Sequence, residues 1–187
     1  MPHKRAAIID AAKTLFAAEG FHATTTDQIA RQAGIAVGTI YNHFGNKEEI
    51  LSAIFLEARD QRIAWWNELD IQLQAQDCIV AFARRHFASI ADDPRLGVIL
   101  THQGMVRPAG MTEFQHDLAA AISGRIRSST DRDDSSDLQI VTVMLMGVLE
   151  AIVREGAGLA ERREREDYFD KALSILSHAA EAMAPKN

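Results

Sequence analysis

Residues 24–47 of this 187-residue chain read TTTDQIARQAGIAVGTIYNHFGNK. Thr25 and Gln28 have the spacing of a capping box, so we expect a helix to begin there and to close at Gly34. A second short helix is expected over residues 37–44, after a turn at residues 34–36. Apolar residues on the two segments can pack against each other at an angle. This stretch therefore predicts a helix-turn-helix unit.

The second of these helices is expected to leave a polar surface facing outward. That surface consists of Val37, Gly38, Thr39, Tyr41, Asn42 and His43. Its polar side chains carry hydroxyls, an amide and an imidazole, and none of them is a carboxylate. Hydroxyls and imidazole suit phosphate oxygens, whereas an amide and a methyl group suit the base edges of the major groove. These are the properties of a helix that reads duplex DNA.

The rest of the chain is predicted to be helical as well. The four prolines stand at positions 2, 94, 108 and 185, and the long stretches between them are free of a residue that breaks helices. Apolar residues recur at helical spacing, as in Ile8, Ala12 and Phe16, and no convincing alternating pattern of a strand is found. We expect an all-α protein of about nine helices. Those beyond residue 45 are expected over residues 46–70, 76–91, 95–105, 111–127, 137–155 and 165–183, with a polar connector over residues 128–137.

Charge is divided unevenly along the chain. Residues 1–47 carry five basic and three acidic side chains, a net charge of +2, whereas residues 48–187 carry 15 basic and 23 acidic ones, a net charge of −8. Only the first part is therefore suited to a polyanion. The single cysteine excludes a disulfide framework and fits a reducing compartment.

Composition and motifs exclude several other classes. No apolar run reaches the ~20 residues of a membrane span. The start of the chain lacks the apolar stretch of a secretory signal, so a cytoplasmic location without membrane contact is expected. The seven histidines have no metal-ligand spacing, and the motifs of hydrolases, nucleotide-binding proteins and zinc proteases are missing. We expect no enzyme activity, no cofactor and no metal site.

An ordered set of residues in the first part of the chain matches a known signature. The matching residues are Gly20, Thr24, Thr25, Ile29, Ala30, Ala33, Gly34, Ile35, Gly38, Thr39, Ile40, Tyr41, His43, Phe44, Lys47 and Ile50. In these residues the chain resembles the DNA-binding domain of TetR-type transcriptional regulators. The resemblance covers residues 8–55 and implies a three-helix DNA-binding domain followed by a helical domain for ligand binding and dimerisation.

The resemblance implies a role in DNA binding for nine residues. Phosphate contacts would fall to Thr25, Thr26, Thr39, Tyr41, His43 and Lys47. Gly38 would let the second helix approach the DNA closely, whereas Val37 and Asn42 would read bases. Other readings stay open from the residues alone: Tyr41 as a core aromatic, His43 as a helix cap, and Asn42 as a solvated residue.

Two positions depart from the pattern of the family. Ala36 stands where a serine often caps the second helix, and the loss of such a cap costs ~0.5–2 kcal/mol. Asp27 stands where many relatives carry a basic residue. It would read a cytosine amino group, repel phosphate, or favour the start of its own helix through the helix dipole.

The second part of the chain is expected to form the effector-binding and dimerisation domain, over residues 61–187 after a DNA-binding domain of residues 1–60. The strongly apolar eighth helix and the ninth helix can form half of a four-helix bundle across a two-fold axis, with a monomer core as the alternative. The resemblance also implies a pocket for a small apolar or amphipathic effector, and residues 91–103 resemble family members that sense fatty acyl thioesters. Candidate lining residues are Trp65, Phe82, His86, His102, Met105, Met111 and Met144. His86 can equally be a satisfied core histidine, and the methionines can be core filling.

The function expected from these patterns is that of a homodimeric regulator, with repression as the expected sign. It would bind a palindromic operator in double-stranded DNA and be released by a small-molecule effector. Two alternatives remain. One is an all-α small-molecule-binding protein that has lost operator affinity, which Ala36 and Asp27 favour. The other is a helical enzyme that uses His86 or His102.

Overall fold

The computed structural model describes residues 2–70, 75–101, 117, 120, 124 and 135–183. Within these residues every regular element is a helix, so the all-α prediction is confirmed for the described part. The helix predicted over residues 111–127 lies almost entirely outside it, and α8 begins inside the predicted connector. The helices are α1 (Pro2–Glu19), α2 (Thr26–Gln32), α3 (Val37–Tyr41), α4 (Lys47–Asn67), α5 (Ala75–Asp92), α6 (Pro94–Thr101), α8 (Ser135–Ala157) and α9 (Arg162–Met183).

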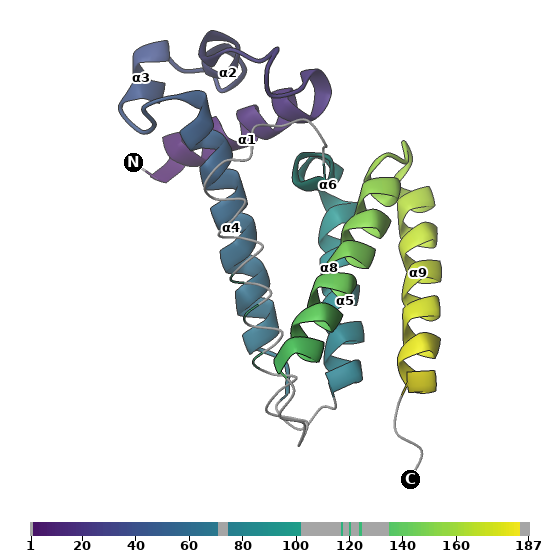
Figure 1. The fold of residues 1–187 in the computed structure, drawn as a ribbon. Coiled ribbons are helices and arrows are strands. Elements are labelled where there is room, and N and C mark those ends of the chain that lie inside the picture. The colour runs from purple at the N-terminus through teal and green to yellow at the C-terminus, as the bar shows by residue number, and fades with distance from the viewer. Residues whose placement is uncertain are drawn as a thin grey trace.

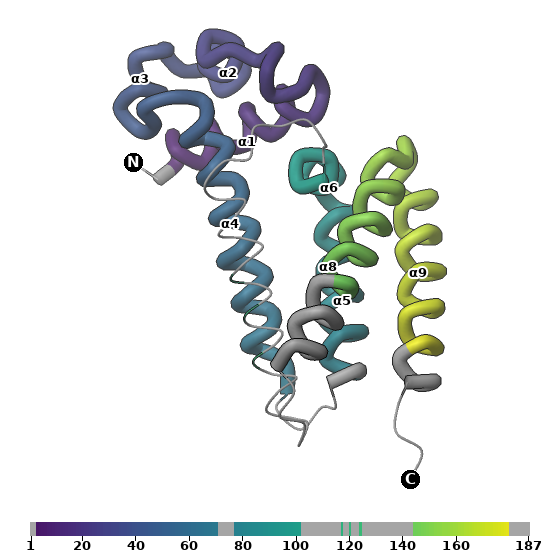
Figure 2. Tube along the Cα trace, in the orientation of Figure 1, coloured from purple at the N-terminus to yellow at the C-terminus, as the bar shows by residue number. Residues whose placement is uncertain are grey.

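The helices are arranged in two groups joined by α4 (Figure 1). We call α1, α2, α3 and the first half of α4 the head, and the remaining described helices the body. In the body α5, α8 and α9 pack against one another, and α6 lies between α1 and α8. Figure 2 shows how α4 runs from the head along the body, which makes it a continuous rod between the two groups.

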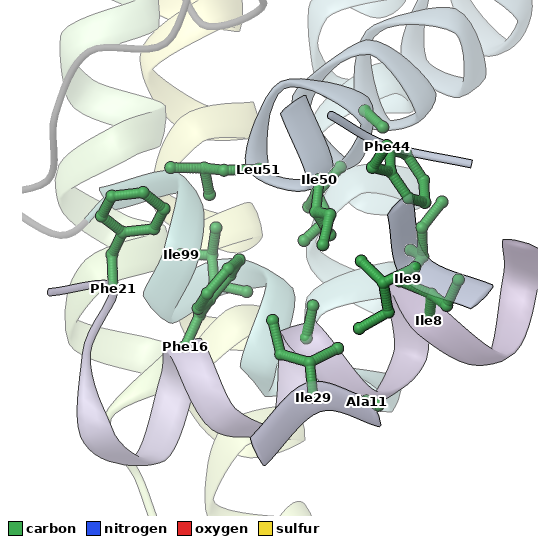
Figure 3. Packing of buried hydrophobic residues seen from close by; sticks show 14 of the residues in the cluster. Ile8, Ile9, Ala11, Phe16, Phe21, Ile29, Phe44, Ile50, Leu51 and Ile99 are labelled. Carbon is green, nitrogen blue, oxygen red and sulfur yellow. The ribbon is translucent and has the colours of Figure 1, made fainter. Parts of the chain in front are cut away.

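The head is held together by a core of buried aliphatic and aromatic side chains (Figure 3). Ile8 of α1, Ile40 of α3 and Ile50 of α4 are all fully buried there. Truncation of one such side chain to alanine costs about 2–5 kcal/mol, because it leaves a cavity in a packed interior. Since Ile40 is a buried residue of a five-residue helix, its packing fixes which face of α3 turns outward.

Local signals in the sequence set the helix ends of the head. Gly20 and Gly34 have φ angles of +85° and +66°, and they follow the ends of α1 and α2 as predicted. Only glycine adopts this left-handed conformation without strain. The side chain of Asn46 accepts a hydrogen bond from the backbone N–H of Glu49 (2.8 Å) and so caps α4, while the Glu49 carboxylate accepts from the backbone N–H of Gly45 (2.8 Å).

The helix α6 connects the head to the body through two kinds of contact. On the body side, a Cβ atom at Gly97 would lie 2.7 Å from Ala157 and 2.8 Å from Ile90, so only glycine fits this crossing. On the head side, Ile99 is buried in the core of the head. Because α6 packs against the body on one face and against the head on the other, a shift of α6 would move both the head and the body.

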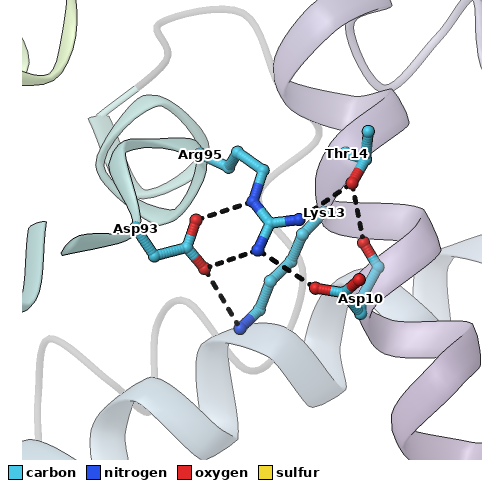
Figure 4. A network of polar contacts seen from close by, with 5 residues as sticks. All are labelled: Asp10, Lys13, Thr14, Asp93 and Arg95. Carbon is cyan, nitrogen blue, oxygen red and sulfur yellow. Dashed lines mark hydrogen bonds and ion pairs between the residues drawn. The ribbon is translucent and has the colours of Figure 1, made fainter. Parts of the chain in front are cut away.

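A polar network reinforces the contact between α6 and α1 (Figure 4). The Arg95 guanidinium forms ion pairs with Asp93 (2.7 Å) and with Asp10 of α1 (3.0 Å), and it donates a hydrogen bond to the Thr14 hydroxyl (2.9 Å). The two carboxylates raise the pKa of Arg95 further above its ordinary value, so the side chain stays charged. The network therefore fixes where the start of α6 meets α1.

Candidate nucleic-acid interface

The start of α2 carries the capping box that the sequence predicts. The Thr25 hydroxyl accepts a hydrogen bond from the backbone N–H of Gln28 (3.2 Å), and the Gln28 side chain accepts one from the backbone N–H of Thr25 (2.7 Å). Thr25 is exposed and Thr26, the first residue of α2, is half-buried. The positive end of the α2 dipole thus faces solvent beside two threonines, an arrangement suited to an anion.

The outward face of α3 is open to solvent. Gly38 and Asn42 are exposed, Val37 and Thr39 are half-buried, and Tyr41 has 56% of its surface exposed. This exposure excludes the alternative that Tyr41 is a core aromatic. Val37 packs in part against the head core, so only a portion of its side chain is available to a partner.

The second helix of the unit is shorter than the sequence indicates. We predicted a helix over residues 37–44, and α3 ends at Tyr41. The backbone N–H groups of His43 and Phe44 both donate to the carbonyl of Ile40, at 2.9 and 2.8 Å, and this closes the helix in a turn. The buried Phe44 then leads the chain into the head core. Asn42 and His43 consequently lie in the turn after α3 and not on the helix itself.

Two of the predicted phosphate-binding residues meet across the unit. The hydroxyls of Thr26 and Tyr41 are 3.3 Å apart, so one donates a hydrogen bond to the other. This contact joins the start of α2 to the end of α3. It restricts the Tyr41 side chain before any partner arrives, which lowers the entropy lost on binding.

Lys47 lies at the start of α4 and reaches back toward the turn between α1 and α2. Its ammonium donates hydrogen bonds to the carbonyls of Phe21 (2.8 Å), His22 (3.3 Å) and Thr24 (2.8 Å). An ammonium has three N–H donors, so these bonds engage all of them. In this conformation Lys47 therefore has no free N–H donor for the predicted contact with a phosphate.

The two departures from the family pattern are visible in the structure. Ala36 precedes α3 and provides no side-chain hydrogen bond to the helix. Asp27 lies exposed in the first turn of α2, where the helix dipole favours a negative charge. This position is consistent with the helix-stabilising reading of Asp27, and a base contact stays a prediction.

Two of the predicted effector-binding residues, Phe82 and His86, lie beside each other on α5, whereas Trp65 of α4 contacts the guanidinium groups of Arg62 and Arg85. The tryptophan that contacts Phe82 is Trp66, with ring centroids 5.6 Å apart. Trp65, Phe82 and His86 are all buried, and the rings of Phe82 and His86 stack with centroids 6.0 Å apart. Met144 is 66% exposed on α8, so the structure does not group it with them. His102, Met105 and Met111 lie outside the described residues.

Sequence reasoning missed the most deeply buried charge of this region, which is Arg62. The Nε of Arg62 donates a hydrogen bond to Nδ1 of His86 (3.1 Å), and its Nη1 donates to the carbonyl of Ala58 (3.1 Å). Burial lowers the pKa of Arg62 to about 10. Burial and the charge of Arg62 together hold the pKa of His86 well below its ordinary value, so the imidazole is neutral. Arg62 continues the buried series Ile54 and Ala58 at intervals of four residues, a spacing that could have revealed its position.

The described residues also bear on two other features, a membrane span and a metal site. None of the described helices is long and apolar enough to cross a membrane. In the same residues, no group of three or more histidine, cysteine, aspartate or glutamate side chains is placed to hold a metal ion.

Comparison with known proteins agrees with this geometry. Residues 8–54 match the family model described as bacterial regulatory proteins, tetR family. The chain is 50% identical over 101 residues to TtgW of Pseudomonas putida, described as an uncharacterized HTH-type transcriptional regulator, across 54% of this chain and 75% of that protein. It is 38% identical over 93 residues to the fatty acid metabolism regulator protein of Bacillus subtilis, a match that spans 49% of this chain and about half, 48%, of that relative.

A solved structure extends the likeness over nearly the whole chain. The transcriptional regulator FadR from Bacillus subtilis, solved in complex with stearoyl-CoA, superimposes with a TM-score of 0.76 at 26% identity. The superposition covers 92% of this chain and 97% of that one. The match of the head to the family model, the identity to TtgW and the shared all-α fold lead to one conclusion. The chain belongs to the tetR family of bacterial regulatory proteins.

Proposed function

We propose that the chain is a homodimeric repressor that binds a palindromic DNA operator through α3 and releases it when a small molecule occupies the body. The observation that carries this proposal is the open, carboxylate-free face of α3 beside the capped start of α2. A positive charge on residues 1–47 favours the approach of this face to DNA, and the negative charge on the rest disfavours other orientations.

Within this proposal, the residues of the face have distinct roles. The start of α2 and the hydroxyls of Thr26, Thr39 and Tyr41 would bind phosphate oxygens. Val37 and Asn42 would contact base edges, and Asn42 would do so from the turn that follows α3. Because His43 is half-buried in the same turn, its imidazole would reach only a phosphate next to the head. Thr25 would hold the start of α2 in place, since its hydroxyl and its backbone N–H are both already bonded to Gln28.

A second copy of the chain is the proposed partner of α8 and α9. Met144 and Val148 on α8 and Ile175 on α9 are large apolar residues exposed to solvent in the described part of the chain. Burial of such side chains favours association, and a two-fold pair of α8–α9 units forms a four-helix bundle. The pair would place its two α3 helices in successive major grooves, ~34–36 Å apart. Residues 1–60 would then act as the DNA-binding part and residues 61–187 as the effector-binding and dimerising part.

A fatty acyl thioester is the effector that we propose. The Bacillus subtilis relative named for fatty acid metabolism, and the stearoyl-CoA held by the FadR structure, support this class. We place the acyl chain between α4 and α5, beside the buried side chains of Trp65, Phe82 and His86. Since α4 also forms part of the head, occupation of this region would change the orientation of α3.

Selection of genomic DNA fragments with the purified protein tests the first part of the proposal. We expect enrichment of one palindromic sequence, bound as a dimer with an affinity that falls steeply with salt. Tyr41→Phe should weaken binding about tenfold for each half-site, because it removes a hydroxyl that bonds to phosphate. The matched control is Tyr168→Phe, which makes the same change on α9. If no sequence is enriched above random fragments, operator binding is refuted.

The effector is tested on the selected operator. Stearoyl-CoA should weaken operator binding in a saturable manner, whereas free coenzyme A at equal concentration should not. A shift of the bound population from 99% to 1% would require an affinity difference of about 5.5 kcal/mol between the two states. Unchanged operator affinity at saturating stearoyl-CoA would refute this choice of effector and leave operator binding intact.

One observation favours a second candidate function, that of a helical ligand-binding protein without operator affinity. The N-cap residue of α3, Ala36, provides no side-chain cap, and the helix has only five residues. Ala36→Ser separates the candidates. If a weak cap alone limits operator affinity, the serine restores it, whereas a protein that has lost the function gains no sequence-specific binding from one cap.

A further inference from the structure

Lys47 occupies a position that is unfavourable for a cation. It is the first residue of α4, directly after the cap Asn46, and a positive charge at this end opposes the helix dipole. Its two neighbours in the first turn, Glu48 and Glu49, carry the charge that the dipole favours. The ammonium must therefore gain its stabilisation from other groups.

Those groups are the carbonyls of one short turn. Phe21, His22 and Thr24 each present a carbonyl oxygen to the Lys47 ammonium, at 2.8, 3.3 and 2.8 Å. The ammonium also lies 4.5 Å from the centre of the Phe21 ring, a cation–π contact. Since Phe21 is buried and Lys47 half-buried, these contacts are partly shielded from water and are stronger than at an open surface.

The turn that Lys47 holds leads directly into the proposed phosphate-binding face. Gly20 follows the end of α1, and the hydroxyl of the buried Thr24 donates a hydrogen bond to the Gly20 carbonyl (2.8 Å). Thr25 follows as the cap of α2, and Thr26 contacts the Tyr41 hydroxyl. The position of the turn thus sets the position of both threonines relative to α4.

We infer that Lys47 is a positioning residue of the DNA-binding face and does not bind phosphate directly. It gathers the three carbonyls of the α1–α2 turn around one ammonium and so fixes the start of α2 against α4. This inference deepens the proposed operator binding and rests on it. The arrangement of the turn itself is measurable without DNA.

Two substitutions distinguish the roles. Lys47→Met keeps the length of the side chain and removes all donors. Lys47→Arg keeps the charge, but a planar guanidinium cannot converge on three carbonyls as an ammonium does. A phosphate-binding residue would tolerate arginine, whereas a positioning residue would not. The control is Arg31→Met, which removes an exposed charge from the last turn of α2.

The first measurement is amide hydrogen exchange of the free protein. We expect faster exchange of residues 21–26 in both Lys47 variants, with unchanged exchange in α5 and α9. Unchanged exchange of the turn in both variants would overturn the inference, whatever the DNA result. This readout also remains valid if no operator is found, so the failure of the inference and the failure of the proposed function can be told apart.

The second measurement is the salt dependence of operator binding. We expect both variants to weaken binding about tenfold or more, with a slope of log K against log salt within about 0.5 of the unsubstituted protein. Loss of a direct phosphate pair from each protomer would lower the slope by about 1.8 in total. A fall of that size in Lys47→Met, together with full affinity of Lys47→Arg, would overturn the inference.

Discussion

A methyl group at position 38 should raise the stability of the protein and lower its operator affinity. Gly38 is the second residue of α3, and its φ angle is not in the left-handed region. A Cβ atom built there meets nothing within 4 Å. The fold therefore gives no reason for glycine at this position. Alanine in a helix is favoured over glycine by about 0.5–1 kcal/mol, and the short helix places the expected gain at the lower end.

On the DNA the same methyl group acts in the opposite direction. If α3 enters the major groove, Gly38 lies where the helix backbone comes closest to the duplex, and the methyl group pushes the helix outward. Phosphate contacts of neighbouring residues then lengthen together. We expect a loss of about 1–3 kcal/mol in the free energy of operator binding, which is about 5- to 150-fold in affinity.

Urea unfolding and fluorescence anisotropy with a labelled operator measure the two effects on the same Gly38→Ala preparation. The reasoning is refuted if operator affinity stays within about twofold while stability rises, since α3 then does not approach DNA closely. A marked fall in stability would instead show that the space beside Gly38 is filled.

The remaining predictions concern the body. Because the pKa of His86 in the folded protein lies below its unfolded value, the unfolded chain takes up a proton first as the pH falls. The His86 contribution to the free energy of unfolding should therefore be constant at pH values well above the unfolded pKa. Below that pKa it should decrease by up to about 1.4 kcal/mol per pH unit. In urea unfolding between about pH 5 and 7.5, His86→Gln should remove this slope. Gly156→Ala should lower the free energy of unfolding by about 1–3 kcal/mol, because the new Cβ would collide with the Phe169 ring; an unchanged melting temperature would contradict the packing. Met144→Glu with Ile175→Glu should shift sedimentation from dimer to monomer without loss of helical circular dichroism, and a persistent dimer would place the interface elsewhere.

Much of the head could be predicted from the sequence because its signals are local. The capping box of Thr25 and Gln28, the left-handed glycines at positions 20 and 34, and the cap at Asn46 each involve residues within a few positions of one another. The same reasoning overestimated α3, since the choice between one more helical turn and a tight turn depends on the burial of Phe44 in a core built from distant segments.

The site was harder to predict where its contacts join distant parts of the chain. Lys47 lies 26 residues from Phe21, and a motif match placed its ammonium on DNA, whereas the structure places it on three carbonyls. Arg62 and His86 lie 24 residues apart, so nothing in the order of residues shows that one donates to the other.

The sequence by itself determined that this protein is helical and belongs to a DNA-binding family, because helix periodicity, caps and turn glycines act over a few residues and are written in order along the chain. Only the tertiary structure decided which polar groups are already engaged. The partners of Lys47, Arg62 and Arg95 are chosen by how helices pack in three dimensions, and a hydrogen bond between distant residues forms only after that packing has brought donor and acceptor together.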